Sequence, residues 1–179
     1  MARIPYVSRD TMPEGRVDLY DRLLAERGPD LEHIFLALAS TADLMEAVLG
    51  MATALRRRTA LPRVFRELAV VTVGIAMGAS YEVDHHWNAA LRAGVRREQL
   101  EHLEEFETAT CFTEQERAVI RLAQEITGAG EVDDETWDAT AFLGQRQRLE
   151  LLLTIAWYNC VVRIILPLRI DKEPWFVRL

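Results

Sequence analysis

The segment Tyr81–Trp87 is the densest run of titratable side chains in the sequence. Successive residues on a helix turn by about 100°, which places Glu82 one turn before His86 on the same side. His86 then lies at the edge of an apolar stripe that contains Val83 and Trp87. A carboxylate beside an imidazole orients the ring and raises its pKa, so this pair predicts proton transfer near neutral pH. The alternative is a histidine at the edge of the core whose ring is satisfied by a neighbouring glutamate.

Glu67 is the third candidate acid–base residue. It is the last charged residue before the uncharged run Leu68–Tyr81. Burying a carboxylate costs free energy unless it is compensated. We therefore expect Glu67 either to be a boundary residue paired with Arg63 or Arg66, or to be compensated within a functional site.

Polar residues also interrupt the apolar segment near the end of the chain. Asn159 and Arg163 are four residues apart, which is one helical turn. An arginine in apolar surroundings is expected to meet an anion, so we expect Arg163 to contact Glu67, Glu82 or a substrate anion. Two tyrosines, Tyr81 and Tyr158, neighbour these polar positions. Arg163, Asn159, Tyr81 and Tyr158 form the predicted substrate-binding set.

Metal binding is weighed separately. Glu82 and His85 have the spacing of a di-iron ligand pair, but such a site needs a second copy on another helix. The other histidines, His33 and His102, lie in acidic, surface-like segments without that spacing. A mononuclear site on Glu82 and His86 is an alternative. We predict no metal and no cofactor.

The sequence contains few thiol or amine nucleophiles. Cys111 and Cys160 are the two cysteines and Lys172 is the one lysine. The wide cysteine spacing excludes a disulfide scaffold and a CxxC pair. Cys160 is expected to be a small buried apolar residue, and Lys172 lies in a tail that is unsuited to Schiff-base chemistry.

Composition limits the class of protein. The 179 residues are 50% hydrophobic and 27% charged, with a formal net charge of -7. This length predicts one domain over residues 1–179 with a substantial core. The hydrophobic content excludes a disordered chain, and the counts of 9 glycines and 6 prolines argue against a fibrous one. The acidic balance argues against nucleic-acid binding, and the cluster Arg56–Arg58 is interpreted as the basic end of a helix.

No segment has the pattern of a signal peptide, and the apolar stretch Leu151–Leu168 contains Asn159, Arg163 and Pro167. We interpret that stretch as a buried core helix and expect no membrane partner. The predicted location is the cytoplasm.

Apolar residues recur at three- and four-residue spacing along nearly the whole chain, which predicts an all-α fold. Residues 1–13 are expected to form an irregular arm and 172–179 a tail. Gly94 is predicted to cap a helix in the left-handed conformation, and Thr113 and Glu116 have the spacing of a capping box. The predicted helices cover residues 17–28, 31–39, 42–57, 63–77, 81–93, 96–106, 113–126, 136–142 and 146–166.

Two segments hint at an internal repeat. Residues 66–72 and 149–154 both place an acid before an apolar run that ends in a threonine. Helices share such patterns by chance, so the resemblance between the two segments is weak.

The order and spacing of these residues resemble the carboxymuconolactone decarboxylase / alkylhydroperoxidase D-like family over residues 15–171. Each motif alone is modest. The residues that carry the resemblance are 66–70, 78–82 with His85 and His86, 89–95, 116–118, and 156–159 with Arg163.

This resemblance implies an all-helical fold that assembles as a homo-oligomer, a trimer or a hexamer. In the peroxidase branch it also implies a glutamate, a CxxC pair and a histidine. Glu67 and His86 stand at the glutamate and histidine positions, but Ala79 and Glu82 stand where the two cysteines would be. A dithiol cycle needs a thiolate and a resolving partner, so the chain is more similar to the decarboxylase branch.

Three hypotheses about function follow. The first is a cofactor-free acid–base enzyme, a decarboxylase-, isomerase- or dehydratase-type lyase, that acts on a small cyclic carbonyl or carboxylate compound through His86, Glu82 and Glu67. The second is a non-catalytic oligomeric binding protein on the same fold, and the third is a hydroperoxide-reducing oxidoreductase. A family name does not settle the substrate.

Overall fold

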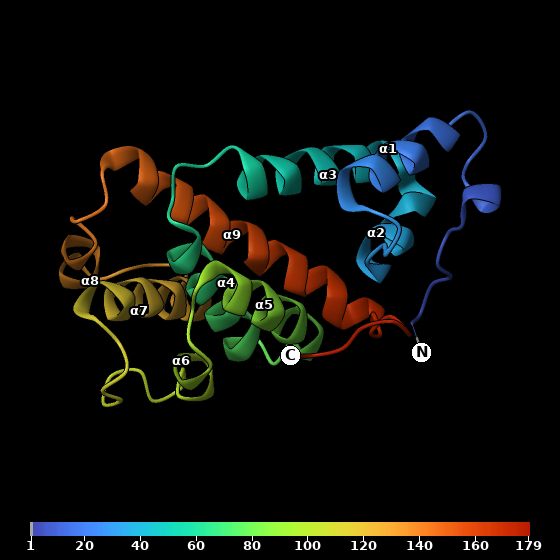
Figure 1. Cartoon of the computed structure of the whole chain (residues 1–179). Coiled ribbons are helices and arrows are strands. Elements are labelled where there is room, and N and C mark those ends of the chain that lie inside the picture. Colours follow the sequence, from blue (N-terminus) through green and yellow to red (C-terminus); the bar gives the residue numbers. More distant parts are fainter. Residues whose placement is uncertain (1) are drawn as a thin grey trace. The chain divides into compact units, whose positions relative to one another are not determined.

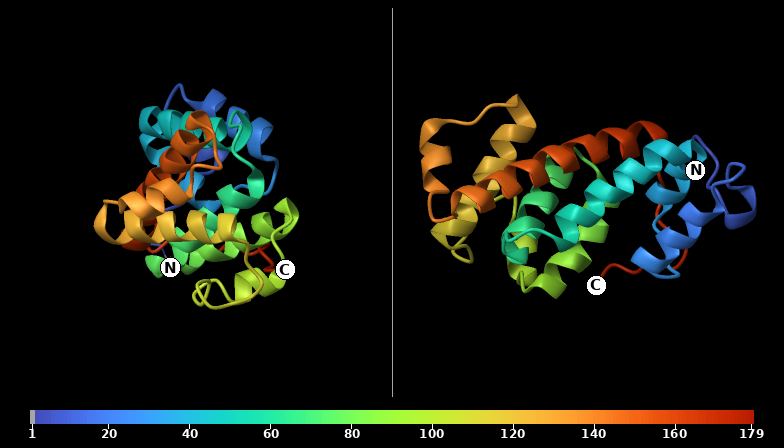
Figure 2. Two further views of the ribbon diagram at one scale, coloured as in Figure 1. Left: turned by 90° about the vertical axis from the view of Figure 1, so that its left-hand side faces the viewer. Right: turned by 90° about the horizontal axis from the view of Figure 1, so that it is seen from above.

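The computed structural model describes residues 2–179, and every regular element in that range is helical (Figures 1 and 2). The predicted all-α class is therefore confirmed. Short 3-10 helices are labelled η. The elements are η1 (Arg9–Thr11), α1 (Val17–Arg27), α2 (His33–Leu38), η2 (Ala39–Thr41), α3 (Ala42–Arg57), α4 (Arg63–Ala76), α5 (Ser80–Ala93), α6 (Arg97–Glu101), α7 (Glu114–Ala129), α8 (Asp134–Ala139) and α9 (Gln145–Leu168).

The chain forms two compact units. Unit 1 is the chain up to Arg58 together with Ile165–Val177, and unit 2 is Thr59–Ile164 together with Arg178–Leu179. The sequence predicted one domain, and each unit has a hydrophobic core of its own.

Unit 1 is built from α1, α2 and α3. Leu19 and Leu23 of α1 and Met45 and Leu49 of α3 are almost completely buried in its core. These pairs are four residues apart, so each helix presents one apolar stripe to the other.

Unit 2 has α4 at its centre, packed against both α5 and α7 (Figure 1). Residues 66–74 of α4 are all buried, because this helix meets neighbours on several sides. One core lies around Ala69, Val119 and Ile155, and a second around Leu68, Trp87 and Ile120. A helix that is apolar around most of its circumference is expected at the middle of a bundle.

Several helix ends follow the sequence signals. Gly94 caps α5 with a φ of 102°, and the hydroxyl of Thr113 accepts a hydrogen bond from the Glu116 N–H at 3.2 Å. Glu116 returns the contact by accepting from the Thr113 N–H at 2.8 Å, which completes the predicted capping box.

The helix predicted over 96–106 is wrong in length, because α6 ends at Glu101. The following residues form separate turns that still bury Leu103 and Phe106. Acidic side chains at 101, 104 and 105 would face one another along a continued helix, which disfavours it. Leu103 and Phe106, three residues apart, are therefore both buried by turns rather than by a helix.

Helix α9 runs to Leu168, beyond the predicted end before Pro167. A proline in the last turn removes one backbone hydrogen bond near an end where few remain. The segment was interpreted as a buried core helix, but only one face is buried: Ile155 and Val162 are inaccessible, whereas Leu153 is 41% exposed.

Two helical stretches within residues 2–179 are long and apolar enough to cross a membrane by length and composition, namely 33–57 and 145–168. Core helices of soluble proteins meet the same criterion, so this is weak evidence for a span.

The two segments that hinted at a repeat share one local feature. The Thr72 hydroxyl donates to the Leu68 carbonyl at 2.7 Å, and the Thr154 hydroxyl donates to the Glu150 carbonyl at 2.8 Å. Both threonines are buried within helices, where this backward hydrogen bond satisfies the hydroxyl.

Candidate active site

The candidate site lies in unit 2, where α4 and α5 pack against each other. A short turn joins the two helices, and Gly78 in this turn has a φ of 64°. The Ala79 N–H donates to the Gly74 carbonyl at 2.8 Å, which fixes the turn against the end of α4. This hairpin brings Glu67 of α4 to His86 of α5.

His86 lies between two carboxylates. Its Nδ1 is 2.7 Å from Glu67 Oε2, and its Nε2 is 3.0 Å from Glu82 Oε1. The exposed fractions of the side chains are 18% for His86, 4% for Glu67 and 6% for Glu82. The predicted trio is therefore brought together, with one carboxylate at each ring nitrogen.

The two carboxylates determine the charge of the ring. Burial alone lowers the pKa of His86, but Glu67 and Glu82 outweigh it and raise the pKa to about 10. Burial likewise raises the pKa of Glu67, and the charges of His86 and Arg66 outweigh it, so the pKa of Glu67 lies below its ordinary value. At neutral pH the ring is an imidazolium whose two N–H groups both donate.

Arg66 is the second cation at Glu67. Its Nε and Nη2 lie 3.0 Å and 2.9 Å from Glu67 Oε1, and its side chain is only 7% exposed. The sequence left Arg63 and Arg66 as alternatives, and the structure selects Arg66. Each oxygen of Glu67 thus has its own cationic partner.

The two predicted tyrosines have different places. The rings of Tyr158 and His86 pack edge to face, with 4.8 Å between their centroids. Tyr81 instead stacks on His85 at 4.3 Å, and His85 Nδ1 is 2.9 Å from the Tyr81 carbonyl oxygen. Tyr158 therefore belongs to the surroundings of His86, whereas Tyr81 contacts the neighbouring histidine.

Arg163 does not contact Glu67 or Glu82, contrary to the expectation from sequence. Its Nη1 donates to the backbone oxygen of Asn159 at 2.8 Å and to Oδ1 of Asn159 at 2.7 Å, and the residue is exposed. The reason is helical geometry, because Arg163 lies about 140° around α9 from Tyr158. The expected contact with a glutamate failed, since an apolar sequence context does not reveal which face of a helix is covered. The contact between Arg163 and a substrate anion stays a prediction.

Asn159 is held by neighbours of its own. Its amide donates to the Thr127 hydroxyl at 2.9 Å and to the Ile155 carbonyl at 3.1 Å. Thr127 is a contact that sequence reasoning missed, and no spacing pattern linked it to Asn159. This part of the predicted substrate-binding set is joined to α7.

The cysteines stand apart from the positions that a dithiol site would use. Ala79 and Glu82 lie at the start of α5, whereas Cys111 precedes α7 and Cys160 is an exposed residue of α9. The prediction that Cys160 is buried was wrong. A protonated His86 has no lone pair to offer a metal ion, and the expected lack of a cofactor stays a prediction.

The end of the chain contacts α5, which sequence reasoning also missed. Arg178 Nη1 donates to Asp84 Oδ1 at 2.8 Å, and its guanidinium lies 3.8 Å from the centroid of a Trp87 ring. The Leu179 N–H donates to Asn88 Oδ1 at 2.8 Å. No pattern in the sequence predicted this docking, because it depends on where the tail folds back.

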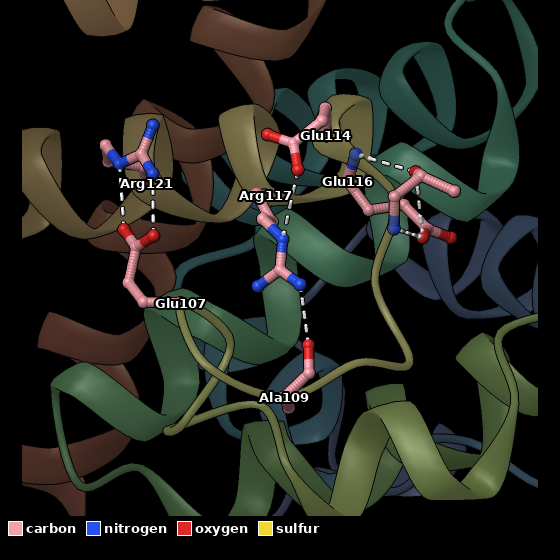
Figure 3. Close-up of polar contacts among 7 residues, drawn as sticks. Glu107, Ala109, Glu114, Glu116, Arg117 and Arg121 are labelled. Atoms are coloured by element: carbon pink, nitrogen blue, oxygen red, sulfur yellow. Dashed lines mark hydrogen bonds and ion pairs between the residues drawn. The ribbon is translucent and has the colours of Figure 1, made fainter.

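A second group of polar contacts holds the segment before α7 (Figure 3). Nε and Nη2 of Arg121 contact the two carboxylate oxygens of Glu107 at 2.8 Å and 2.7 Å. Arg117 Nη2 donates to the Ala109 carbonyl at 2.6 Å, and its Nε is 3.6 Å from Glu114 Oε1. This group contains no histidine or thiol, so we assign it a structural role.

A pocket of about 320 Å³ lies elsewhere in unit 2. It does not include His86, Glu67 or Glu82. Its lining consists of Thr72, Ile75, Ala76, Leu103, Glu104 and Gln124.

Comparison with known families adds to this geometry. Residues 42–125 match the model of the carboxymuconolactone decarboxylase family. This range of the protein belongs to that family. The matched range includes Glu67, Glu82 and His86. Among curated proteins, no sequence matches this family member.

Solved structures share the fold of this carboxymuconolactone decarboxylase family protein. An uncharacterized peroxidase-related protein from Ralstonia eutropha JMP134, described as an alkylhydroperoxidase AhpD core, is 18% identical with a TM-score of 0.83, covering 97% of this chain and 93% of its own. The debrominase Bmp8 in its apo form is 20% identical with a TM-score of 0.80, covering 96% and 92%.

A third structure is a protein of unknown function from Agrobacterium tumefaciens, described as a putative antioxidant defence protein AhpD. It is 17% identical with a TM-score of 0.68, covering 76% of this chain and 94% of its own. At these identities the similarity shows the fold alone. The family and the fold are thus established, and the reaction is a separate question.

Proposed function

We propose that this protein is a cofactor-free acid–base enzyme that acts on a small cyclic carbonyl or carboxylate compound. The observation that carries the proposal is a protonated, largely buried His86 with a carboxylate at each ring nitrogen. Strongly perturbed titratable groups cluster at functional sites. The membership of a family that takes its name from a decarboxylase agrees with this reaction class.

His86 is suited to donate a proton in this site. Both ring nitrogens carry hydrogen at neutral pH, so the ring has no free position to accept one. Glu67 holds the Nδ1 side, which leaves Nε2 as the side from which a proton leaves. One oxygen of Glu82 contacts Nε2 at 3.0 Å. We infer that Glu82 transfers the proton between His86 and the reactant.

Decarboxylation illustrates the chemistry. The bond between the ring carbon and the carboxylate breaks, CO2 leaves, and the electron pair moves onto a conjugated carbonyl as an enolate. Glu82, protonated by His86, then gives its proton to the reactant carbon, and solvent reprotonates His86. Isomerisation and dehydration use the same proton transfers, so the substrate decides between them.

A turnover assay on carboxylated lactones and β-keto acids tests this proposal. We expect His86→Asn and Glu82→Gln each to lower kcat by about 100-fold or more, the range of general acid–base catalysis. His102→Asn is the matched control, because the side chain of His102 is 55% exposed and its Nδ1 lies 3.9 Å from Glu105 Oε2. Unchanged turnover in His86→Asn would refute the assigned role.

A non-catalytic binding protein is the second candidate. The observation in its favour is that Glu67 and both ring nitrogens of His86 already have partners within the chain. Binding alone, however, does not require a proton donor, and the pKa of His86 is strongly raised. It would be favoured if none of the tested carbonyl compounds were turned over while one bound.

We also propose that the protein forms a homo-oligomer. The family resemblance implies a trimer or a hexamer. In addition, α9 has an exposed apolar face at four- and three-residue spacing, formed by Leu149, Leu153, Ala156 and Cys160. We call these four residues the α9 stripe. An exposed apolar face of several turns is suited to burial against a second copy of the chain.

A further inference from the structure

The point where α4 and α5 approach most closely lies beside the candidate site. Gly74 of α4 faces Val83 of α5. A Cβ atom placed on Gly74 would lie 2.9 Å from Val83 Cγ2, 3.3 Å from the Val83 nitrogen and 3.6 Å from its Cα. Because the first distance is shorter than normal van der Waals contact, only glycine fits at this position without a shift of one helix.

The side chain of Val83 cannot simply turn away from such a contact. Valine on a helix is almost confined to one rotamer about χ1. The Val83 nitrogen, moreover, belongs to the helix backbone and donates to the Ala79 carbonyl at 3.0 Å. A larger residue at 74 must therefore push α4 and α5 apart rather than displace one side chain.

The catalytic residues lie on the same two helices, close to this contact. Glu67 precedes Gly74 by seven residues, which is two helical turns, so both face the same side of α4. His86 follows Val83 by three residues, and Glu82 immediately precedes Val83 on α5. The distance between the helices at Gly74 therefore influences the 2.7 Å contact between Glu67 and His86.

We propose that Gly74 is a positioning residue: its lack of a side chain sets the α4–α5 distance at which Glu67 reaches His86. This inference deepens the proposed function, on which its catalytic meaning rests. The groups that contact His86 are Glu67 from α4, Glu82 from α5 and Tyr158 from α9, and Arg66 of α4 contacts the other oxygen of Glu67. Widening the α4–α5 spacing acts on Glu67 and Arg66 and leaves Glu82 on the helix of His86.

Side-chain NMR of the histidines provides a test that needs no substrate. The chain has four histidines, and His86→Asn assigns the His86 signal. In Gly74→Ala we expect the pKa of His86 to fall from about 10 by about one unit or more, because an opposite charge moves away from the ring. In Gly74→Ala/Val83→Ala the 2.9 Å contact is gone and the 3.3 Å contact remains, so the pKa should lie between those of Gly74→Ala and the native protein.

Two controls isolate the effect. Gly50 lies within α3 and a Cβ atom there meets nothing within 4 Å, so Gly50→Ala should leave the pKa of His86 unchanged. Val83→Ala alone should also leave it close to the native value. A folded Gly74→Ala protein with a native His86 pKa would overturn the inference.

Misfolding of Gly74→Ala would not end the test. The double variant would then be compared with Val83→Ala: a lower His86 pKa in the double variant supports the inference, and equal values overturn it. Failure of the catalytic proposal would be seen separately. In that case the native protein would show no turnover, while the pKa of His86 would still change when residue 74 is replaced.

Discussion

The ring of His86 donates from Nδ1 to Glu67 across 2.7 Å, and this contact joins α5 to α4 within the buried part of unit 2. An imidazolium and a carboxylate in contact form a charge-assisted hydrogen bond, which is stronger than one between neutral groups. The same contact that gives His86 its unusual pKa therefore also contributes to the stability of the fold.

Stability should fall at alkaline pH. The pKa of His86 is about 10 in the folded protein and about 6.5 in an unfolded chain. A raised pKa contributes stability that is fully present below pH 6.5 and is lost as pH rises to about 10, at about 1.4 kcal/mol per pKa unit. Urea unfolding between pH 6 and 10.5 measures this loss.

His86→Gln and Glu67→Gln provide the comparison for that measurement. Each removes one charge of the pair, so the decline in the free energy of unfolding between pH 6.5 and 10 should become shallower. An equally steep decline in His86→Gln would mean that other groups cause it.

Arg66 should matter more for stability than its sequence position suggests. Removing one partner of a buried ion pair leaves the other uncompensated, and here Glu67 would keep only His86. We expect Arg66→Met to lower the free energy of unfolding by about 2–4 kcal/mol in chemical denaturation.

A matched pair of exposed charges is available for comparison with Arg66. Arg9 contacts both carboxylate oxygens of Asp21 at 2.9 Å and 3.0 Å, but the two side chains are 55% and 50% exposed. Arg9→Met should cost about 0–1 kcal/mol. If both variants lost the same amount, burial of the Arg66–Glu67 pair would not be the cause.

The cysteines should be dispensable for activity. Positions 79 and 82, where a dithiol site would have its cysteines, hold Ala79 and Glu82, and Cys111 and Cys160 lie elsewhere. A thiol cycle needs two cooperating sulfurs. A Cys111→Ser/Cys160→Ser protein should keep the native rate of turnover of the carbonyl substrate. Hydroperoxide consumption that is present in the native protein and lost in this variant would instead support the oxidoreductase alternative.

A charge on the α9 stripe should prevent assembly. Leu149 and Leu153 are 54% and 41% exposed, and a carboxylate at either place would have to be desolvated between copies. We expect Leu153→Glu to sediment as a monomer of 20.4 kDa, whereas the native protein sediments as an oligomer.

The control for the stripe is Glu104→Gln, which changes an exposed residue away from α9 and should keep the native sedimentation. A native protein that sediments as a monomer would refute the proposed homo-oligomer itself. An oligomer that survives Leu153→Glu would place the interface on another surface.

The parts of the site that were predictable lie close together in sequence. Glu82 and His86 are one turn apart on one helix, so helical periodicity alone predicted their contact. The capping signals at Gly94 and Thr113 were equally local, and both occur as predicted. The assignment of Glu67 to the same site came from the family resemblance rather than from any spacing.

The parts that were not predictable depend on which helix faces are covered. Arg163 and Asn159 have the spacing of a binding pair, but the fold turns Arg163 to an exposed face. The docking of Arg178 on Asp84 and the close approach of Gly74 to Val83 are tertiary contacts that no local pattern encodes. The α6 boundary failed because turns reproduced a helical apolar spacing.

One consequence of the site concerns its charge balance. Arg66 and His86 carry two positive charges and Glu67 and Glu82 two negative charges, so the largely buried group is neutral at rest. Release of one proton to a reactant leaves a net negative charge in a poorly solvated place, which is costly. The group therefore returns to neutrality by drawing a proton from solvent before the next turnover. At high pH the uptake of this proton from solvent should become the slow step of the cycle.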